Sequence, residues 1–285
     1  MEITITQAER ERAGMAETTL AAAVDALLAD GYVVIADAIN HDHLDLLCER
    51  MTADSHKLIA AEKWGGVGRV PGNLQEGPRP VAPFVSTDFV RNPFAIQVTH
   101  AVLGDGLYNR FYNGNANCPG SGTQPLHADG AHLWPKANFA HPPASLIINI
   151  CPVEVSEENG ATELWPGTHR LTMSGQYVSP EVERQRREVT PPVRATTRKG
   201  SLLIRDPRLW HRGVPNHSGT VRHMIAMIHN ISWLQHPGPL LFSSDCADAF
   251  PAGPLDHNVE FTDKPLGYLF TRFPTIIEPG AASTE

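Results

Sequence analysis

The first sixty residues show two helical hydrophobic patterns with a strand pattern between them. Apolar residues recur at three- and four-residue intervals over 19–30 and again over 40–53, and this spacing predicts two amphipathic helices. Gly31 is placed to end the first helix, and the apolar run 32–38 predicts a strand. The sequence therefore predicts a helix–strand–helix unit within residues 19–60.

Residues 64–84 break this pattern. The segment is rich in glycine and proline and lacks hydrophobic periodicity, so it predicts a long loop. Loops of this length in compact domains are usually lids or binding loops, but a flexible surface excursion explains the composition equally well. The sequence leaves both interpretations open.

Short apolar runs separated by turn residues fill the chain from residue 107 to residue 230. Glycine and proline are abundant, with 23 and 24 copies in 285 residues. This punctuation is typical of an antiparallel sandwich or barrel, so we expect a mainly β protein with flanking helices (α+β). A polar insertion at 170–198 interrupts the strands, and no linker is evident, so we predict a single domain over 1–285 with a β core at 107–235. The predicted strands are 107–116, 123–129, 145–151, 161–165, 192–196, 200–205, 208–212 and 221–230.

Charge and composition narrow the possible partners. The formal net charge of −8 argues against a nucleic-acid partner, because phosphate backbones need clustered lysine and arginine. The first twelve residues do not resemble a secretory signal, and no apolar stretch is long enough to span a membrane. The four cysteines are far apart, which favours reduced thiols in a cytoplasmic protein. Residues 279–285 read as a loose tail.

Fourteen histidines make a metal site worth testing, and two His-x-Asp triplets occur. His43 and Asp45 lie on a predicted helix, where positions i and i+2 point in nearly opposite directions, so they cannot bind one ion. His127 and Asp129 lie in a predicted strand, where the same spacing puts both side chains on one face. An imidazole and a carboxylate there can converge on one metal.

His211 is the best candidate for a third ligand, because it follows the predicted strand 200–205 and a tight turn. Two histidines and one carboxylate form the facial triad that holds non-haem Fe(II) and leaves open positions. Eleven residues later, Arg222 shares a strand face with Met224 and Ala226. A buried arginine needs an anionic partner, and the residues leave two options even: a bound carboxylate, or an ion pair with Glu154 or Glu163.

The order of four motifs resembles the phytanoyl-CoA dioxygenase family across roughly residues 20–235. The motifs are His127-Ala128-Asp129, Asn159-Gly160-Ala161-Thr162 with Pro166-Gly167-Thr168-His169, His211 and Arg222. Members are Fe(II)/2-oxoglutarate oxygenases with a double-stranded β-helix core, a jelly-roll or cupin-like fold. The resemblance therefore implies Fe(II), 2-oxoglutarate and O₂ as cofactor and co-substrates.

The resemblance also implies roles for single residues. His127, Asp129 and His211 match the iron ligands, and Arg222 matches the residue that binds the distal carboxylate of 2-oxoglutarate. Thr162, Gln124, Asn149 and Asn115 match or resemble positions that contact the co-substrate. Trp134 resembles an aromatic residue beside the active site, although ordinary packing under a loop explains it equally well. Met224 would line an apolar floor.

The resemblance implies an oxygenase that hydroxylates a small molecule, with release of succinate and CO₂. We expect a free, mostly apolar substrate, such as a secondary-metabolite intermediate. An acyl-CoA substrate is the alternative within the family, because the segment 181–200 contains six basic residues, although its acidic residues partly balance them. The same residues also fit a zinc-dependent enzyme without O₂ chemistry, or a binding module on the same barrel. The oligomeric state stays open.

Overall fold

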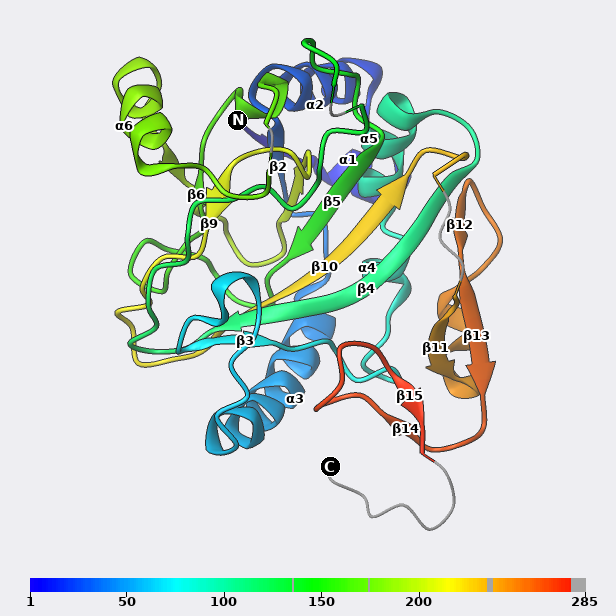
Figure 1. The fold of residues 1–285 in the computed structure, drawn as a ribbon. Coiled ribbons are helices and arrows are strands. Elements are labelled where there is room, and N and C mark those ends of the chain that lie inside the picture. Colours follow the sequence, from blue (N-terminus) through cyan, green and yellow to red (C-terminus); the bar gives the residue numbers. More distant parts are fainter. Residues whose placement is uncertain (135, 174, 235–237, 278–285) are drawn as a thin grey trace.

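The computed structural model shows a mainly β fold with flanking helices, as predicted (Figure 1). The structure describes residues 1–134, 136–173, 175–234 and 238–277. The predicted tail at 279–285 lies outside these residues. Within them, no helix is long and apolar enough to cross a membrane, and all four cysteines are free.

The larger sheet has eight strands in the order β1-β2-β8-β5-β10-β4-β12, with β3 also paired to β4. Its long central strands β5, β10 and β4 run side by side in antiparallel register (Figure 1). The strands are β1 (Glu2–Thr4), β2 (Tyr32–Ala36), β3 (Asn73–Gln75), β4 (Leu107–Asn117), β5 (Ser145–Ile150), β8 (Leu202–Arg205), β10 (Arg222–Asn230) and β12 (Leu255–His257).

A smaller, three-stranded sheet contains His211, one of the predicted metal ligands. Strands β7 (Val193–Arg194), β6 (Glu163–Leu164) and β9 (His211–Arg212) pair in the order β7-β6-β9. Isolated bridges extend this pairing from His211 to His127 and from His127 to Tyr177. In the described residues, neither sheet closes into a barrel.

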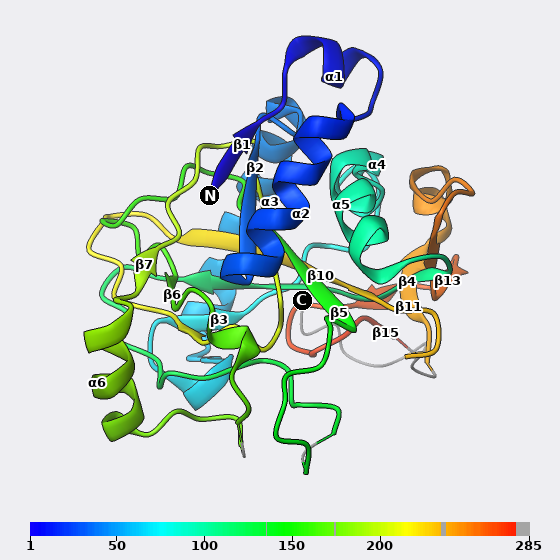
Figure 2. The same ribbon diagram turned by 90° about the horizontal axis from the view of Figure 1, so that it is seen from above.

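Helices cover one face of the larger sheet (Figure 2). Helices α2 and α5 pack against each other and on strands β2, β4 and β5, and α3 packs on β10. The predicted N-terminal helices are confirmed: α2 ends at Gly31, whose φ of 85° is left-handed, and Asn40 caps α3. The helices are α1 (Gln7–Glu11), α2 (Glu17–Asp30), α3 (His41–Ala60), α4 (Thr87–Val90), α5 (Pro93–Leu103) and α6 (Pro180–Val189), with 3₁₀ turns at η1 (Val67–Arg69), η2 (Thr168–Arg170) and η3 (Ser244–Ala249).

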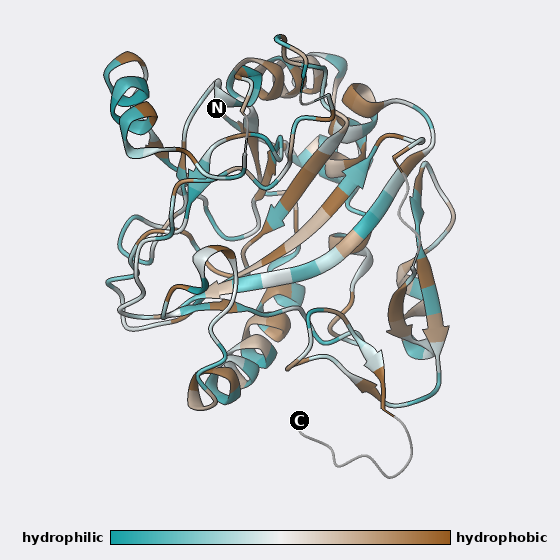
Figure 3. Cartoon of the chain, in the orientation of Figure 1, coloured by the Kyte–Doolittle hydropathy of each residue, from teal (hydrophilic) through white to brown (hydrophobic). Residues whose placement is uncertain are grey.

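Side-chain alternation along β10 assigns the two faces of the larger sheet. Ile225 and Met227 are fully buried in the main core with the helices, whereas Arg222 and Met224 line a cavity on the other face. Strand β5 is largely hydrophobic and β4 carries several polar positions (Figure 3). The polar side chains of the larger sheet that could bind a ligand therefore lie on the face away from the helices.

Two sequence predictions about local structure fail. Residues 123–129 form no strand and make only isolated bridges at His127, because Pro125 has no N–H to donate in the middle of the segment. The segment 64–84 is not wholly a loop, since β3 pairs with β4 there. Sheets β11 (Leu240–Ser243) with β13 (Val259–Thr262), and β14 (Leu266–Gly267) with β15 (Thr275–Ile276), complete the C-terminal part.

Candidate metal centre

His127, Asp129 and His211 come together at the junction of the two sheets. One ligand atom from each lies within 4.8 Å of the others. The Nε2 atom of His127 is 3.6 Å from Asp129 Oδ1, and the Nε2 atom of His211 is 3.2 Å from Asp129 Oδ2. Although 123–129 is not a strand, both side chains of the His-x-Asp pair still meet His211 at one place. The predicted convergence of the three residues is therefore present.

Hydrogen bonds to the backbone fix the tautomer of both imidazoles. The Nδ1 atom of His127 lies 2.9 Å from the carbonyl oxygen of Pro125, and the Nδ1 atom of His211 lies 2.9 Å from that of Leu209. A carbonyl oxygen only accepts, so each Nδ1 carries a proton and each Nε2 is the ring nitrogen that lies near Asp129. Metal-binding histidines are commonly oriented in this way. The donor set therefore suits a divalent transition metal.

The protonation states of His211 and Asp129 favour cation binding. Burial lowers the pKa of His211 to about 4, with a further contribution from Arg205, so its ring is neutral at pH 7. Desolvation raises the pKa of Asp129, but the Arg205 guanidinium, which donates to its Oδ2, helps to hold that pKa well below its usual range. The site thus offers the neutral imidazole of His211 and an ionised carboxylate.

Arg205 is a site residue that the sequence analysis did not single out. Its Nη2 donates to Asp129 Oδ2 at 2.6 Å, and its Nε donates to Asn149 Oδ1 at 3.1 Å. A signal was present, because Arg205 ends an apolar strand and shares a face with Leu203. The reasoning that selected Arg222, a charge among inward-facing apolar residues, applies equally to Arg205.

Beside the metal candidates lies a cavity that contains Arg222, and we call it the Arg222 cavity. Arg222 is buried, and its Nη2 donates to the carbonyl of Gly160 at 3.2 Å. Among the described residues, no carboxylate lies within ion-pair distance of Arg222, and Glu163 pairs with Arg212 instead. The expected alternative of an internal ion pair is therefore absent there. The cavity is lined by Asn149, Cys151, Val155, Thr162, Ala195, Thr197, Ser201, Leu203, Arg222 and Met224.

The remaining predicted residues divide into two groups. Thr162, Asn149 and Met224 line the Arg222 cavity. Asn115 pairs with Met224 across the sheet but is not among the lining residues. The Oε1 atom of Gln124 accepts from the backbone N–H of Gly213 at 2.8 Å, two residues beyond His211. This hydrogen bond ties Gln124 to the segment that follows His211.

Trp134 is neither packed under a loop nor inside the Arg222 cavity. Its side chain is 53% exposed, and its ring meets that of His141 edge-on, with centroids 5.2 Å apart. Trp134 follows Asp129 by five residues, so it lies on the loop that leaves the metal candidates. Of the two interpretations left open, packing under a loop does not fit this exposure.

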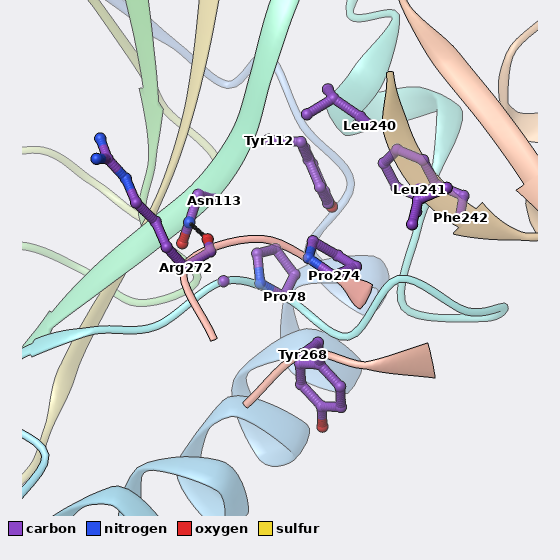
Figure 4. A pocket seen from close by; sticks show the side chains of 10 residues that line it. Pro78, Tyr112, Asn113, Leu240, Leu241, Phe242, Tyr268, Arg272 and Pro274 are labelled. Carbon is purple, nitrogen blue, oxygen red and sulfur yellow. Dashed lines mark hydrogen bonds between the residues drawn. The ribbon is translucent and has the colours of Figure 1, made fainter. Parts of the chain in front are cut away.

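A second pocket lies beside β4 and shares no residue with the candidate site. Tyr112, Phe242 and Pro274 supply much of its wall (Figure 4). The side-chain amide of Asn113 donates to the backbone carbonyl of Arg272, so that polar group is engaged by the protein. None of the metal candidates found in the described residues lines this pocket.

A solved structure and two curated proteins resemble this chain. The crystal structure of AviO1 from Streptomyces viridochromogenes Tue57 superposes with a TM-score of 0.56 at 20% identity, covering 79% of this chain and all of that one. Dioxygenase af480 of Aspergillus fumigatus is 29% identical over 129 residues, 45% of this chain and 39% of that protein. Dioxygenase FrzG of Cladobotryum sp is 29% identical over 135 residues, 46% of this chain and 44% of that protein. The match spans less than half of either relative.

The family model of phytanoyl-CoA dioxygenase matches residues 27–224. That span includes all three metal candidates and Arg222, and the structural neighbour supports the expected cupin-like, jelly-roll core without a closed barrel. The chain therefore belongs to the phytanoyl-CoA dioxygenase family of oxygenases.

Proposed function

We propose that this chain is an Fe(II)- and 2-oxoglutarate-dependent oxygenase that hydroxylates an unactivated C–H bond of a small, mostly apolar molecule, such as a secondary-metabolite intermediate. The observation that carries the proposal is the pairing of a His–Asp–His cluster with a buried arginine in the adjoining cavity. A two-histidine, one-carboxylate site suits Fe(II), with His127, Asp129 and His211 as its ligands. Oxygenase chemistry also agrees with the family.

The Arg222 cavity fits a carboxylate ligand. Arg222 has no acidic partner among the described side chains, and a buried guanidinium is costly without an anion. Two further polar atoms on the cavity wall, Ser201 Oγ and Asn149 Nδ2, are buried without a hydrogen-bond partner in the part of the chain that the structure describes. Arg222 would grip the distal carboxylate of 2-oxoglutarate, and Thr162 would add a hydroxyl. An additional carboxylate clamp is not needed by a zinc hydrolase.

Bound together, Fe(II) and 2-oxoglutarate supply the oxidising chemistry: O₂ is reduced as 2-oxoglutarate becomes succinate and CO₂, and one oxygen atom enters succinate while the other enters the substrate. The protein contributes orientation and electrostatics. The two imidazoles are held by the Pro125 and Leu209 carbonyls. Leu203 and Met224 give the cavity apolar walls that limit water.

Exposed apolar side chains beside the metal candidates favour an apolar substrate. Tyr177 bridges to the backbone of His127 and is 57% exposed. Trp134 and Phe139, on the loop after Asp129, are 53% and 64% exposed. Exposed apolar side chains near a site often mark a binding surface, and we call these three residues the rim. We place the substrate against this rim.

The basic segment 181–200 gives little support to an acyl-CoA substrate, because most of its cations are engaged by the protein. Arg187 pairs with Glu183 and stacks over Trp165. Arg186 and Arg194 donate to backbone carbonyls, and Arg198 and Lys199 pair with acidic side chains. A thioester carrying phosphates would have to break these contacts.

The test is substrate-stimulated succinate release by the Fe(II)-loaded protein in the presence of O₂. A panel of free apolar molecules and the matching CoA thioesters is screened, with the Arg222→Met variant as the control. We expect release that depends on Fe(II) and 2-oxoglutarate and is stimulated by free apolar molecules. Stimulation by thioesters alone would contradict the substrate class, and iron binding without any 2-oxoglutarate turnover across the panel would contradict the reaction.

A further inference from the structure

Arg205 connects the metal candidates to the Arg222 cavity. It is the last residue of β8, and its side chain is 6% exposed. One nitrogen of its guanidinium donates to Asp129 Oδ2, and Nε donates to Asn149 Oδ1, a cavity-lining residue. The guanidinium of Arg205 therefore joins one metal candidate, Asp129, to one residue of the cavity wall, Asn149.

The two oxygens of Asp129 have different neighbours. Oδ2 accepts from Arg205 at 2.6 Å and also lies 3.2 Å from His211 Nε2, whereas Oδ1 lies 3.6 Å from His127 Nε2. Among the described residues, no other arginine or lysine forms an ion pair with Asp129. A carboxylate held at one oxygen by a rigid guanidinium fork can present the other to a metal in one direction.

We propose that Arg205 is a positioning residue that fixes Asp129 as a one-oxygen metal ligand and aligns it with the Arg222 cavity through Asn149. The inference rests on the proposed function only in taking Asp129 as a ligand. Arg205 touches neither substrate nor reacting atoms in this assignment. Partners of metal ligands commonly change metal affinity about 10- to 100-fold when removed.

A nearby ion pair shows what a merely structural arginine looks like in this chain. Arg208 binds Asp206 through two of its nitrogens and donates to the carbonyl of His141. That pair is buried, but neither partner is among the metal candidates or the lining of the Arg222 cavity. Arg205 differs because its guanidinium hydrogen bonds to Asp129 and Asn149 both end on residues of the site.

Co²⁺ binding measures this role without turnover. Calorimetric titration and the visible Co²⁺ spectrum, which reports coordination geometry, are compared for the unsubstituted protein and for Arg205→Met, Arg205→Gln and Arg205→Lys. The matched control is Arg50→Met, which removes a guanidinium bound to the buried Asp54 at 2.6 and 3.0 Å on helix α3. Thermal unfolding of each variant reports any loss of fold.

We expect Arg205→Met and Arg205→Gln to lose about tenfold or more in Co²⁺ affinity and to change the spectrum. Arg205→Lys should recover part of the affinity, because one ammonium keeps the charge but cannot span Asp129 and Asn149 as the fork does. Arg50→Met should lower thermal stability and leave Co²⁺ affinity unchanged.

Three results would overturn the inference. The first is an affinity and spectrum in both Arg205→Met and Arg205→Gln that match those of the unsubstituted protein. The second is an equal affinity loss in Arg50→Met, which would make the effect one of general stability. The third is no Co²⁺ binding by the unsubstituted chain, which would overturn the metal centre as well, so failure of Arg205 alone is distinguishable from failure of the proposed function.

Discussion

His127 and His211 are joined by two reciprocal backbone hydrogen bonds. The N–H of His127 donates to the carbonyl of His211 at 3.1 Å, and the N–H of His211 donates to the carbonyl of His127 at 2.9 Å. Their ring centroids are 4.3 Å apart. Residues far apart in sequence are thus set as neighbours by paired backbone bonds, so both imidazoles are placed before any metal arrives.

Replacing His211 tests the third metal ligand. His211→Ala removes one of two nitrogen donors but leaves the backbone bonds to His127, so the fold should survive while tight Fe(II) binding and turnover are lost. Anaerobic Fe(II) titration and far-ultraviolet circular dichroism check this. The matched control is His217→Ala, at an exposed histidine on the following loop. Turnover retained in His211→Ala would place the third ligand elsewhere.

Replacing Arg222 tests the carboxylate clamp. Arg222→Met should weaken 2-oxoglutarate binding about 10- to 100-fold, the value of a charge-assisted hydrogen bond of about 1.5–3 kcal/mol, while metal affinity stays largely intact. Titration of the Co²⁺-loaded protein measures both affinities.

A ligand control sharpens the Arg222 experiment. 2-Oxovalerate has the same carbon chain as 2-oxoglutarate but lacks the distal carboxylate, so Arg222→Met should change its affinity little. The unsubstituted protein should prefer 2-oxoglutarate, and the variant should lose that preference. A variant that keeps the preference would remove Arg222 from the clamp.

Neighbouring residues of β10 should respond differently to truncation, because they lie on opposite faces of the sheet. Ile225→Ala opens a hole in the main core and should cost about 2–5 kcal/mol in the free energy of unfolding. Met224→Ala widens the Arg222 cavity, so it should cost less stability and change 2-oxo acid affinity more. Urea unfolding and 2-oxoglutarate titration of both variants measure this. Equal stability losses would argue against the two-faced assignment of β10.

Acid should destabilise the fold through two histidines near β12. Burial lowers the pKa of His229 to about 3, helped by His257 and Arg91, and burial with Arg91 lowers the pKa of His257 to about 3. Both rings stay neutral in the fold, whereas they take up protons below about pH 6.5 in the unfolded chain. The unfolded state then binds more protons, so stability falls as pH drops.

The window from pH 6.5 to pH 5 lies above most carboxylate titration, and His211, whose pKa is also low, contributes there in the same direction. The slope should approach, at most, about 1.4 kcal/mol per pH unit for each histidine. Urea unfolding of the unsubstituted protein and of His257→Gln at several pH values measures it, and the variant should show the shallower slope. An unfolding free energy that stays flat over this window in the unsubstituted protein would count against the two buried neutral rings.

Hydrophobic periodicity predicted much of the fold. Helices α2 and α3 and strand β2 lie where the spacing of Leu27, Leu44 and the run 32–38 placed them, because each buries a face that its own sequence defines. Helix α6 was not predicted, since its exposed surface carries almost no apolar face. Strand β1 was missed because three residues pair only through tertiary contact with β2.

The candidate site shows the same division between local and tertiary information. His127 and Asp129 were identified from their spacing, and His211 and Arg222 from their place on short strands. Arg205 had a signal of its own on an apolar strand, but its partners, Asp129 and Asn149, could not be predicted, because they come from distant segments that only the assembled sheets bring together. The contact of Gln124 with Gly213 likewise depends on two loops that meet beside His211.

The central claim is that one site holds both Fe(II) and 2-oxoglutarate. The most direct test is the visible spectrum recorded as Fe(II), and then 2-oxoglutarate, is added anaerobically to metal-free protein. We predict a weak charge-transfer absorption that forms only when both are present, is absent in His211→Ala, and needs much more 2-oxoglutarate in Arg222→Met. Iron binding by the unsubstituted protein with no such absorption at saturating 2-oxoglutarate would contradict the account.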